Sequence, residues 1–236
     1  MKERLLVPER MDDPSLDPVE HRRALRGLRR VNLLCQTGKH LAREIIAISK
    51  QRGLNFVRVL DLGCGSGDVA TDIGSRIDGK LDFSIEGWDI SSTAVDAARI
   101  ALKSTNERLT RGSIAFRQCD VFQATEERFD IVYCCLFLHH FSEEQAVELL
   151  KRMKGLAVQA VLVDDLVRSQ LGLRLAQLGC HLLSRSPVVH FDGPQSVRAA
   201  FTENEACGLA SQAGMKVLSL RRHWPERYLM RWDTPQ

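Results

Sequence analysis

Long apolar runs are absent from this 236-residue chain. No stretch approaches the roughly 18 apolar residues of a transmembrane helix, so we expect no membrane span. The first residues, MKERLLVPERMDD, hold only a short apolar run before Pro8, which is too little for the core of a signal peptide. We therefore expect a cytoplasmic protein.

The chain also lacks a strong charge imbalance, internal repeats and low-complexity tracts. Its net charge is +3 and its pI is near 8.5, which suits an anionic ligand but is far from the basic balance of nucleic-acid-binding domains. Charged residues make up 27% and hydrophobic residues 44%, an ordinary globular composition that argues against disorder. We expect one domain over residues 1–236, as a monomer or a homodimer.

A disulfide framework is missing as well. The seven cysteines are odd in number and scattered, at positions 35, 64, 119, 134, 135, 180 and 207. Without an export signal, such cysteines are expected to be reduced thiols. Their roles are therefore packing, ligand contact or metal binding.

What the sequence does contain is an alternation of short apolar runs with helical stretches. Strands are predicted at 56–62, 83–89, 113–119, 129–136, 158–164 and 216–221, and helices at 68–77, 92–105, 143–154 and 202–213. This order favours right-handed crossovers and a mostly parallel sheet with helices on both faces. The last segment, KVLSLRRHWPERYLMRW, predicts two strands around a turn at Trp224-Pro225-Glu226. The fold class is therefore α/β with an antiparallel C-terminal hairpin.

Two pieces lie outside this alternation, and both can cover the carboxyl edge of the sheet, where ligands of such folds bind. We expect a helical cap at residues 1–52, a core at 53–167, a substrate lid at 168–198, and a C-terminal helix and hairpin at 199–236. In the cap, Arg22, Arg26, Arg29 and Arg30 share one broad helical face. A solvated or lid-facing helix is the main interpretation, and RNA contact is the alternative.

The strongest motif is VLDLGCGSGD at 59–68, a strand that runs into a glycine-rich turn and then a helix. Glycines permit positive φ angles and close backbone approach, so a ligand can lie against this turn and the helix N-terminus. The spacing is GxGxG rather than the GxGxxG of dinucleotide-binding folds, and carboxylates at Asp61 and Asp68 would repel a pyrophosphate. A ligand with an ammonium or sulfonium group would be favoured. An NAD-dependent oxidoreductase is therefore disfavoured.

Two further carboxylates follow the next strands. Asp89 ends the second strand about 20 residues beyond the glycines, where a carboxylate can accept both ribose hydroxyls. Asp120 follows the third strand, placed to accept from an adenine amino group, with the backbone amide of Val121 beside it. The set predicts a nucleoside-containing ligand.

With these residues the chain resembles the class I S-adenosylmethionine-dependent methyltransferases, and among them the UbiE/Coq5-like small-molecule branch. The resemblance spans roughly residues 40–165 and rests on Asp61, Gly63, Gly65, Gly67, Asp89, Asp120 and Asp130 in family order. It implies a Rossmann-like sheet of seven strands, S-adenosylmethionine as cofactor and S-adenosylhomocysteine as product. The cofactor-binding residues that it implies are Asp61, Gly63, Cys64, Gly65, Gly67, Asp89, Ile90, Asp120, Val121 and Cys134.

The stretch CCLFLHHF at 134–141 supplies the candidate catalytic residues. By the same resemblance it follows the fourth strand, beside the transferred methyl group. A phenolic or quinol acceptor reacts as its anion, so a base with a pKa near 7 would help, and histidine is the natural candidate. We rank His140 above His139; the alternative is a histidine that only packs beneath the lid.

We expect no metal. Asp164 and Asp165 end the fifth strand, where catechol methyltransferases hold magnesium, but Cys134 and Cys135 stand where that group carries an acidic ligand, and Mg²⁺ does not favour thiols. A zinc site in CCxxxHH fails because neighbouring strand residues point to opposite faces.

The predicted function is methyl transfer to O or C of a small phenolic, quinol or polyketide-derived acceptor. The segments VDDLVRS and SRSPVVHFDGPQSVRAAFTENE are similar to bacterial methyltransferases associated with polyketide or phenolic-lipid synthesis. No Asn/Asp-Pro-Pro-aromatic motif follows the fourth strand, which lowers the case for nucleobase methylation. His21, His181 and His190 are further candidates for a substrate cavity, or for surface and packing roles. An RNA-modifying enzyme and a non-catalytic S-adenosylmethionine-binding protein remain the alternatives.

Overall fold

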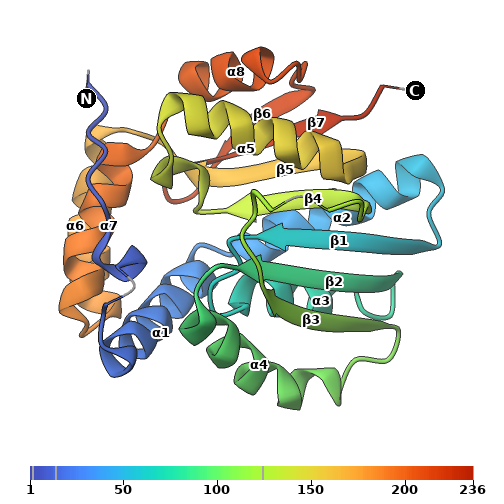
Figure 1. The fold of residues 1–236 in the computed structure, drawn as a ribbon, viewed down its shortest axis with the longest axis horizontal. Coiled ribbons are helices and arrows are strands. Elements are labelled where there is room, and N and C mark those ends of the chain that lie inside the picture. Colours follow the sequence, from blue (N-terminus) through green and yellow to red (C-terminus); the bar gives the residue numbers. More distant parts are fainter. Residues whose placement is uncertain (2, 14, 124, 236) are drawn as a thin grey trace.

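A computed structural model describes the chain except for residues 2, 14, 124 and 236. A seven-stranded sheet has the order β3-β2-β1-β4-β5-β7-β6. Its strands are β1 (Phe56–Leu62), β2 (Asp82–Asp89), β3 (Gly112–Gln118), β4 (Phe129–Cys135), β5 (Ala157–Leu166), β6 (Ser219–His223) and β7 (Arg227–Asp233). The first five strands pair in parallel, whereas β7 is antiparallel to both β5 and β6. The predicted α/β fold with a C-terminal hairpin is confirmed (Figure 1).

Helices cover both faces of the sheet. On one face α2 (Thr37–Arg52), α3 (Asp68–Ile77) and α4 (Ser92–Asn106) contribute to one hydrophobic cluster. On the other face α5 (Glu143–Leu156) and α8 (Glu203–Gln212) contribute to a second cluster. The central strand β4 takes part in both, since Cys134 belongs to the cluster with α5 and Cys135 to the cluster with α2. The two thiols thus face opposite sides of the sheet, as the strand geometry predicts.

The start of α5 and of α8 follows from their capping residues. Ser142 accepts from the backbone N–H of Gln145, whose side chain accepts from the Ser142 N–H, and Thr202 and Glu205 form the same reciprocal pair. Such capping boxes satisfy backbone donors that the first helical turn leaves unpaired. Both boundaries agree with the sequence prediction to within one residue.

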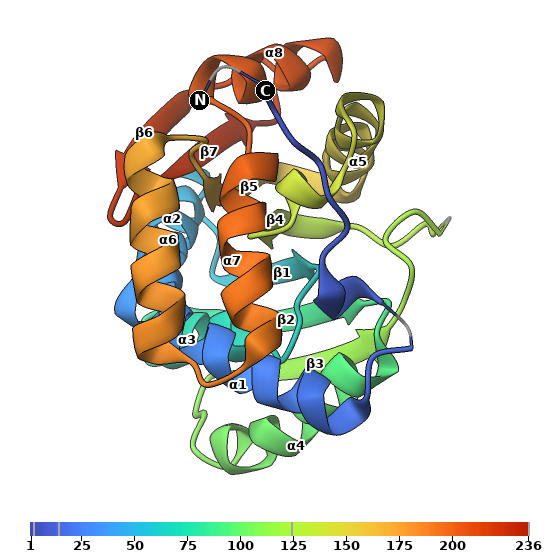
Figure 2. The same cartoon turned by 90° about the vertical axis from the view of Figure 1, so that its left-hand side faces the viewer.

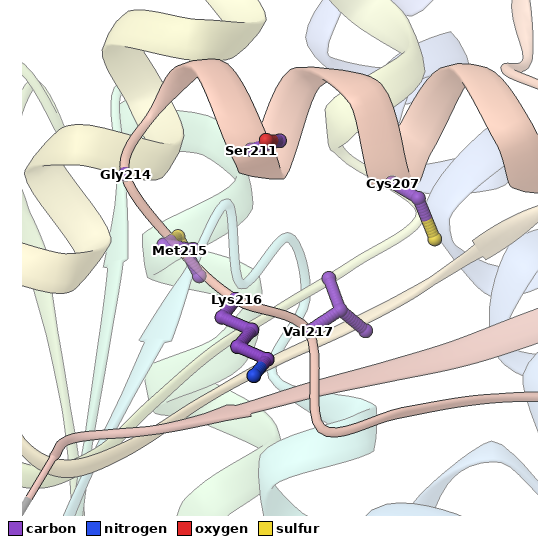
Figure 3. A pocket seen from close by; sticks show the side chains of 6 residues that line it. All are labelled: Cys207, Ser211, Gly214, Met215, Lys216 and Val217. Atoms are coloured by element: carbon purple, nitrogen blue, oxygen red, sulfur yellow. The ribbon is translucent and has the colours of Figure 1, made fainter.

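The predicted strand 216–221 lies three residues early. Pairing with β7 runs from Ser219 opposite Arg231 to His223 opposite Arg227. The preceding residues 214–217 instead form a connection that, with Cys207 and Ser211 of α8, lines a surface hollow of about 430 Å³ (Figure 3). The tertiary pairing, which a local apolar pattern does not contain, sets the register of this strand.

The remaining helices gather at the carboxyl ends of the parallel strands. They are α1 (Pro18–Leu34), α6 (Gln170–Leu183), α7 (Pro187–Ala199) and the short 3₁₀ turns η1 (Arg10–Asp12) and η2 (Leu138–His140). Figure 1 shows α1, α6 and α7 beside the arrowheads of β1 and β4, and Figure 2 views the molecule from that side. Both segments outside the βα alternation therefore lie at the edge where α/β folds bind ligands.

The four arginines predicted to share one face of the cap helix, Arg22, Arg26, Arg29 and Arg30, are all exposed. Arg30 donates to the backbone oxygen of Leu183 at the end of α6, at 3.1 Å. Across the described residues, no helix combines the length and the hydrophobicity needed to cross a membrane.

Candidate functional site

The glycine loop between β1 and α3 adopts a conformation that requires glycine. Gly63, Gly65 and Gly67 have φ angles of 71°, 51° and 69°, which side chains rarely adopt. A Cβ on Gly63 would collide with the ring of Phe137, and one on Gly67 with the ring of Phe116. A Cβ on Gly65 would meet only the Leu25 side chain, at 4.0 Å. Two of the glycines therefore allow close packing, and the third faces space that a ligand can take.

Asp89 at the end of β2 supports this loop. Its carboxylate accepts from the backbone N–H of Gly65 at 2.8 Å and from that of Ser91 at 2.9 Å. Burial raises the pKa of Asp89 above its ordinary value, and these two backbone donors oppose that rise. The acid predicted to accept ribose hydroxyls is thus in contact with the glycine loop.

Asp61 lies in β1, two residues before Gly63, and is 1% exposed. Burial raises the pKa of Asp61 to about 8, while the Tyr133 hydroxyl lowers it and the charges of Asp68 and Asp89 raise it further. A buried carboxyl with no cation beside it is disfavoured in its charged form. A cationic ligand group next to Asp61 would restore that charge.

The other predicted cofactor residues lie along the same edge. Asp120 is exposed, and its carboxylate accepts from the backbone N–H of Phe122 at 2.9 Å. Val121 beside it is buried, whereas Ile90 after β2 is 69% exposed. Cys134 is fully buried in β4 and pairs with Leu62 of β1.

Helix α1 lies over the glycine loop. Leu25 is 5% exposed and is the side chain nearest to the open space at Gly65. His21, one turn earlier, is 7% exposed; burial lowers its pKa, and the charge of Asp89 raises it. Asn32 donates to the Asp68 carboxylate at 3.0 Å. The cap helix is thereby held against the N-terminus of α3.

His139 and His140 sit in η2, directly after β4. The ring Nδ1 of His139 lies 2.7 Å from Oδ1 of Asp165, and the other oxygen of Asp165 accepts from the His139 backbone N–H at 3.1 Å. The ring Nδ1 of His140 lies 2.7 Å from Oδ2 of Asp12. The side chain of His139 is 3% exposed and that of His140 is 20% exposed.

Glu9, from the N-terminal segment, joins the two histidines. Its carboxylate lies 3.4 Å from Nε2 of His139 and 4.0 Å from Nε2 of His140. Burial raises the pKa of Glu9, but the charges of His140 and His139 outweigh burial and lower it to about 2. Burial lowers the pKa of His139, but Asp165 and Glu9 raise it to about 10. His140 shifts in the same direction, since Glu9 and Asp12 outweigh burial and the charge of His139.

This cluster lines a cavity of about 190 Å³. The polar residues that line it are Glu9, Asp12, His139 and His140, and the apolar ones are Leu6, Val7, Pro8 and Ala199. The segment is held in place by Arg4, which donates to the backbone oxygens of His139 and Phe141 at 2.9 and 2.7 Å. Asp192 of α7 accepts from the backbone N–H groups of Arg10 and Met11.

Sequence reasoning did not single out Glu9 or Asp12. Both lie about 130 positions before the histidines in a segment without periodicity, so no local pattern marks them. Asp165 was considered only as a magnesium ligand, and the structure pairs it with His139 instead. Its neighbour Asp164 pairs with Arg227 at 2.5 Å and with His223 at 2.9 Å.

Two histidines proposed for a substrate cavity lie elsewhere. His181 is exposed and stacks on His190 at 4.1 Å. His181 bonds to the backbone oxygen of Gln177 and His190 to that of Ser184. Neither lines the cavity at Glu9. Their placement is that of surface and packing residues.

A methyltransferase domain family matches residues 59–158. No curated protein sequence matches the chain. Solved structures share its fold at low identity. An O-methyltransferase from neocarzinostatin biosynthesis, in complex with S-adenosylhomocysteine and 1,4-dihydroxy-2-naphthoic acid, has a TM-score of 0.65 and 18% identity, over 97% of this chain and 62% of that one.

Magnesium protoporphyrin IX methyltransferase from Synechocystis PCC 6803, with bound S-adenosylhomocysteine, has a TM-score of 0.59 and 19% identity over 87% of each chain. An O-methyltransferase family protein from Burkholderia thailandensis has a TM-score of 0.57 and 20% identity, over 76% of this chain and 51% of that one. At these identities the likeness concerns the fold. Residues 59–158 thus match a methyltransferase domain, and the chain as a whole shares the fold of these solved methyltransferases.

Proposed function

We propose that this S-adenosylmethionine-dependent methyltransferase transfers a methyl group to an oxygen of a small aromatic acceptor, such as a phenol, a quinol or a polyketide-derived ring. The observation that carries the proposal is the cavity of about 190 Å³, which is lined by apolar residues together with Glu9, His139 and His140. Small-molecule sites are mostly apolar with a few convergent polar groups. A ring with one ionisable hydroxyl fits that description.

The residues at the glycine loop fit the cofactor. Open space at Gly65 admits a ligand against the backbone, and Asp89 is placed to accept from ribose hydroxyls while it holds the loop. Asp61 is a buried carboxyl for which the described part of the chain supplies no cationic partner, and an ammonium group of the ligand would suit it. Ile90 offers an exposed apolar surface to a base, with Asp120 after the adjacent strand. The cofactor supplies an electrophilic methyl group when bound.

The acceptor side is formed by three separate pieces of chain. The N-terminal segment brings Glu9 and Asp12, η2 brings the two histidines, and α7 ends at Ala199 on the apolar side. Phe137 packs against Gly63, and its ring centroid lies 6.1 Å from that of His140, so one side chain links the glycine loop to a residue of the cavity. Methyl transfer is an in-line displacement, which requires the acceptor to be positioned against the methyl group and water to be excluded.

Activation of the hydroxyl falls to the cluster of Glu9, His139 and His140. A phenol reacts as its anion, so its proton must be lost or its charge stabilised within this cluster. His140 is the more exposed of the two histidines, and it is the one that we rank first for contact with the acceptor. The neighbour solved with 1,4-dihydroxy-2-naphthoic acid, a phenolic compound, supports this acceptor class.

The first prediction tests the cavity. His140→Ala is expected to lower methyl transfer to phenols, quinols or resorcylic lipids by roughly 10²–10⁴-fold, the usual contribution of one acid–base group. Isotopic methyl transfer across this acceptor panel measures the rate, and calorimetry with S-adenosylhomocysteine measures cofactor affinity, which should not change.

His181→Ala is the matched control, since His181 lies on the surface of α6 away from the cavity. An unaltered rate in the His140 variant would contradict the acceptor site. Transfer to RNA alone, or cofactor binding without transfer to any acceptor, would favour the RNA-modifying or the non-catalytic alternative.

A further inference from the structure

We propose that Glu9, His139 and His140 form a binding site for a divalent transition-metal ion, with two imidazole nitrogens and one carboxylate as ligands. One ligand atom from each residue lies within 4.8 Å of the other two. Two histidines and one glutamate are a donor set that zinc accepts with its fourth position open. The site contains no cysteine and differs from the CCxxxHH arrangement, which strand geometry excludes.

The distances suit a tetrahedral ion. Ligands that bind zinc at about 2.0–2.1 Å lie about 3.3–3.4 Å from one another around a tetrahedron. Oε1 of Glu9 is 3.4 Å from Nε2 of His139, and Oε2 of Glu9 is 4.0 Å from Nε2 of His140. The first distance already matches a tetrahedral ion, and the three ligand atoms, which lie within 4.8 Å of one another, would draw together around it, chiefly by movement of the more exposed His140.

The partners of the ligands supply a second, independent argument. Each histidine has its Nδ1 at 2.7 Å from a carboxylate, Asp165 for His139 and Asp12 for His140. Metal-binding histidines have this arrangement, because the outer carboxylate fixes the tautomer and directs the other nitrogen at the ion. Ser196 also donates to the Glu9 carboxylate, at 2.5 Å. Each of the three ligands thus has a hydrogen-bond partner that fixes its orientation: Asp165 for His139, Asp12 for His140 and Ser196 for Glu9.

Charge and space at the site agree with a cation. Three carboxylates, those of Glu9, Asp12 and Asp165, surround the two imidazoles, and a bound ion at Nε2 would take the place of the protons that these carboxylates favour there. The guanidinium of Arg4 lies nearby, but it donates to backbone oxygens of His139, Phe141 and Ala199. The cluster borders the cavity of about 190 Å³, so a fourth ligand can enter from that side.

A role for the ion rests on the proposed function. With the ion bound, His139 and His140 would be ligands rather than bases, and an acceptor hydroxyl in the fourth position would bind as its anion and release its proton to water, since a metal ion lowers the pKa of a bound hydroxyl. The same three residues would then both hold the metal and place the acceptor. Metal binding itself needs no acceptor and can be measured alone.

The test uses the full-length, untagged protein after treatment with a chelator. Calorimetry with Zn²⁺ should show one ion per chain, and Co²⁺ should give the visible absorption of a four-coordinate ion. Asp12→Asn should weaken binding roughly 10–100-fold, the usual cost of losing an outer carboxylate. Glu9→Gln and His140→Ala remove ligands and should weaken it more.

The controls separate this site from other histidines. His181→Ala and His190→Ala should leave zinc affinity unchanged, and all variants should keep S-adenosylhomocysteine binding as evidence of folding. The proposal is overturned if the wild-type protein binds no stoichiometric ion, or if Glu9→Gln and His140→Ala bind as tightly as wild type. In that case the cluster is a network of alternating ion pairs. Because no acceptor is used, this failure is distinct from a failure of the proposed function.

Discussion

Two buried carboxyl groups near the carboxyl ends of the strands, Asp165 and Asp61, have pKa values shifted in opposite directions. Asp165 is buried beside His139, whose charge outweighs burial and lowers the pKa of the acid. Asp61 is equally buried but has no cationic partner among the residues that the structure describes, and burial raises its pKa to about 8. The charge of His139 therefore keeps Asp165 ionised. A cationic group of a bound ligand would do the same for Asp61.

Asp61 should therefore make the free energy of unfolding fall as the pH rises. Its ordinary pKa is 3.8 and its folded-state pKa is about 8, so the folded state binds the proton more tightly between these values. The destabilisation is absent below about pH 4, grows with pH, and is complete above about pH 8. Asp61→Asn removes it. Urea unfolding should show the variant gaining stability over wild type from pH 5 to pH 8, and a pH-independent difference would contradict the assignment.

Asp89 should matter for the cofactor more than for the fold. Asp89→Ala removes an acceptor for ribose hydroxyls and loosens Gly65, so S-adenosylhomocysteine should bind more weakly by about 1.5–3 kcal/mol, the range for a hydrogen bond to a charged group. Calorimetry measures the affinity, and thermal unfolding checks that the variant folds. Unchanged affinity in a folded variant would remove Asp89 from the ribose site.

Residues before α1 form the N-terminal segment, in which the only described regular element is the short turn η1. This segment nevertheless contacts two distant parts of the chain. Arg4 ties it to the loop after β4, and Asp192 ties it to α7. These bonds join chain positions more than 130 residues apart. A segment without a helix or strand pattern thus forms one wall of the candidate acceptor site.

Helix α5 begins with a capping box, two residues after the η2 turn that contains the histidines. The box should therefore contribute to the stability of this part of the chain. Ser142→Ala removes a side-chain acceptor for the first turn and should lower the free energy of unfolding by about 1 kcal/mol. Ser75→Ala is the matched control: Ser75 is exposed within α3, where alanine is the better helix former. Denaturant unfolding of both variants makes the comparison, and equal effects would deny the cap its role.

At the scale of the molecule, α1 covers the glycine loop, where we propose that the cofactor binds, and the N-terminal segment lines the proposed acceptor cavity at the same sheet edge. S-adenosylhomocysteine at 100 times its Kd should stabilise the protein by about 2.7 kcal/mol through mass action. Because Leu25 faces the open space at Gly65, bound ligand should also slow amide hydrogen exchange in α1. Exchange that slows in the sheet but not in α1 would show that the cap does not close on the ligand.

The local patterns were sufficient where an element is defined by its own residues. The strand Phe56–Leu62 and the helix Asp68–Ile77 occur as predicted, since an apolar run and a glycine turn determine them directly. The strand Ser219–His223 was misplaced because its register depends on pairing with β7. The histidines were found because they follow a central strand. Glu9 was missed because it reaches them only through tertiary packing.

The sequence by itself determined the α/β architecture, the glycine loop and the order of acids along the strand ends, because each follows from residue type and short-range spacing. Only the tertiary structure decided which acids meet which histidines. In the sequence, Asp165 follows the histidines, whereas Asp12 and Glu9 precede them by about 130 positions. Contacts between such distant positions depend on the packing of the N-terminal segment against the sheet edge, and no local pattern records that packing.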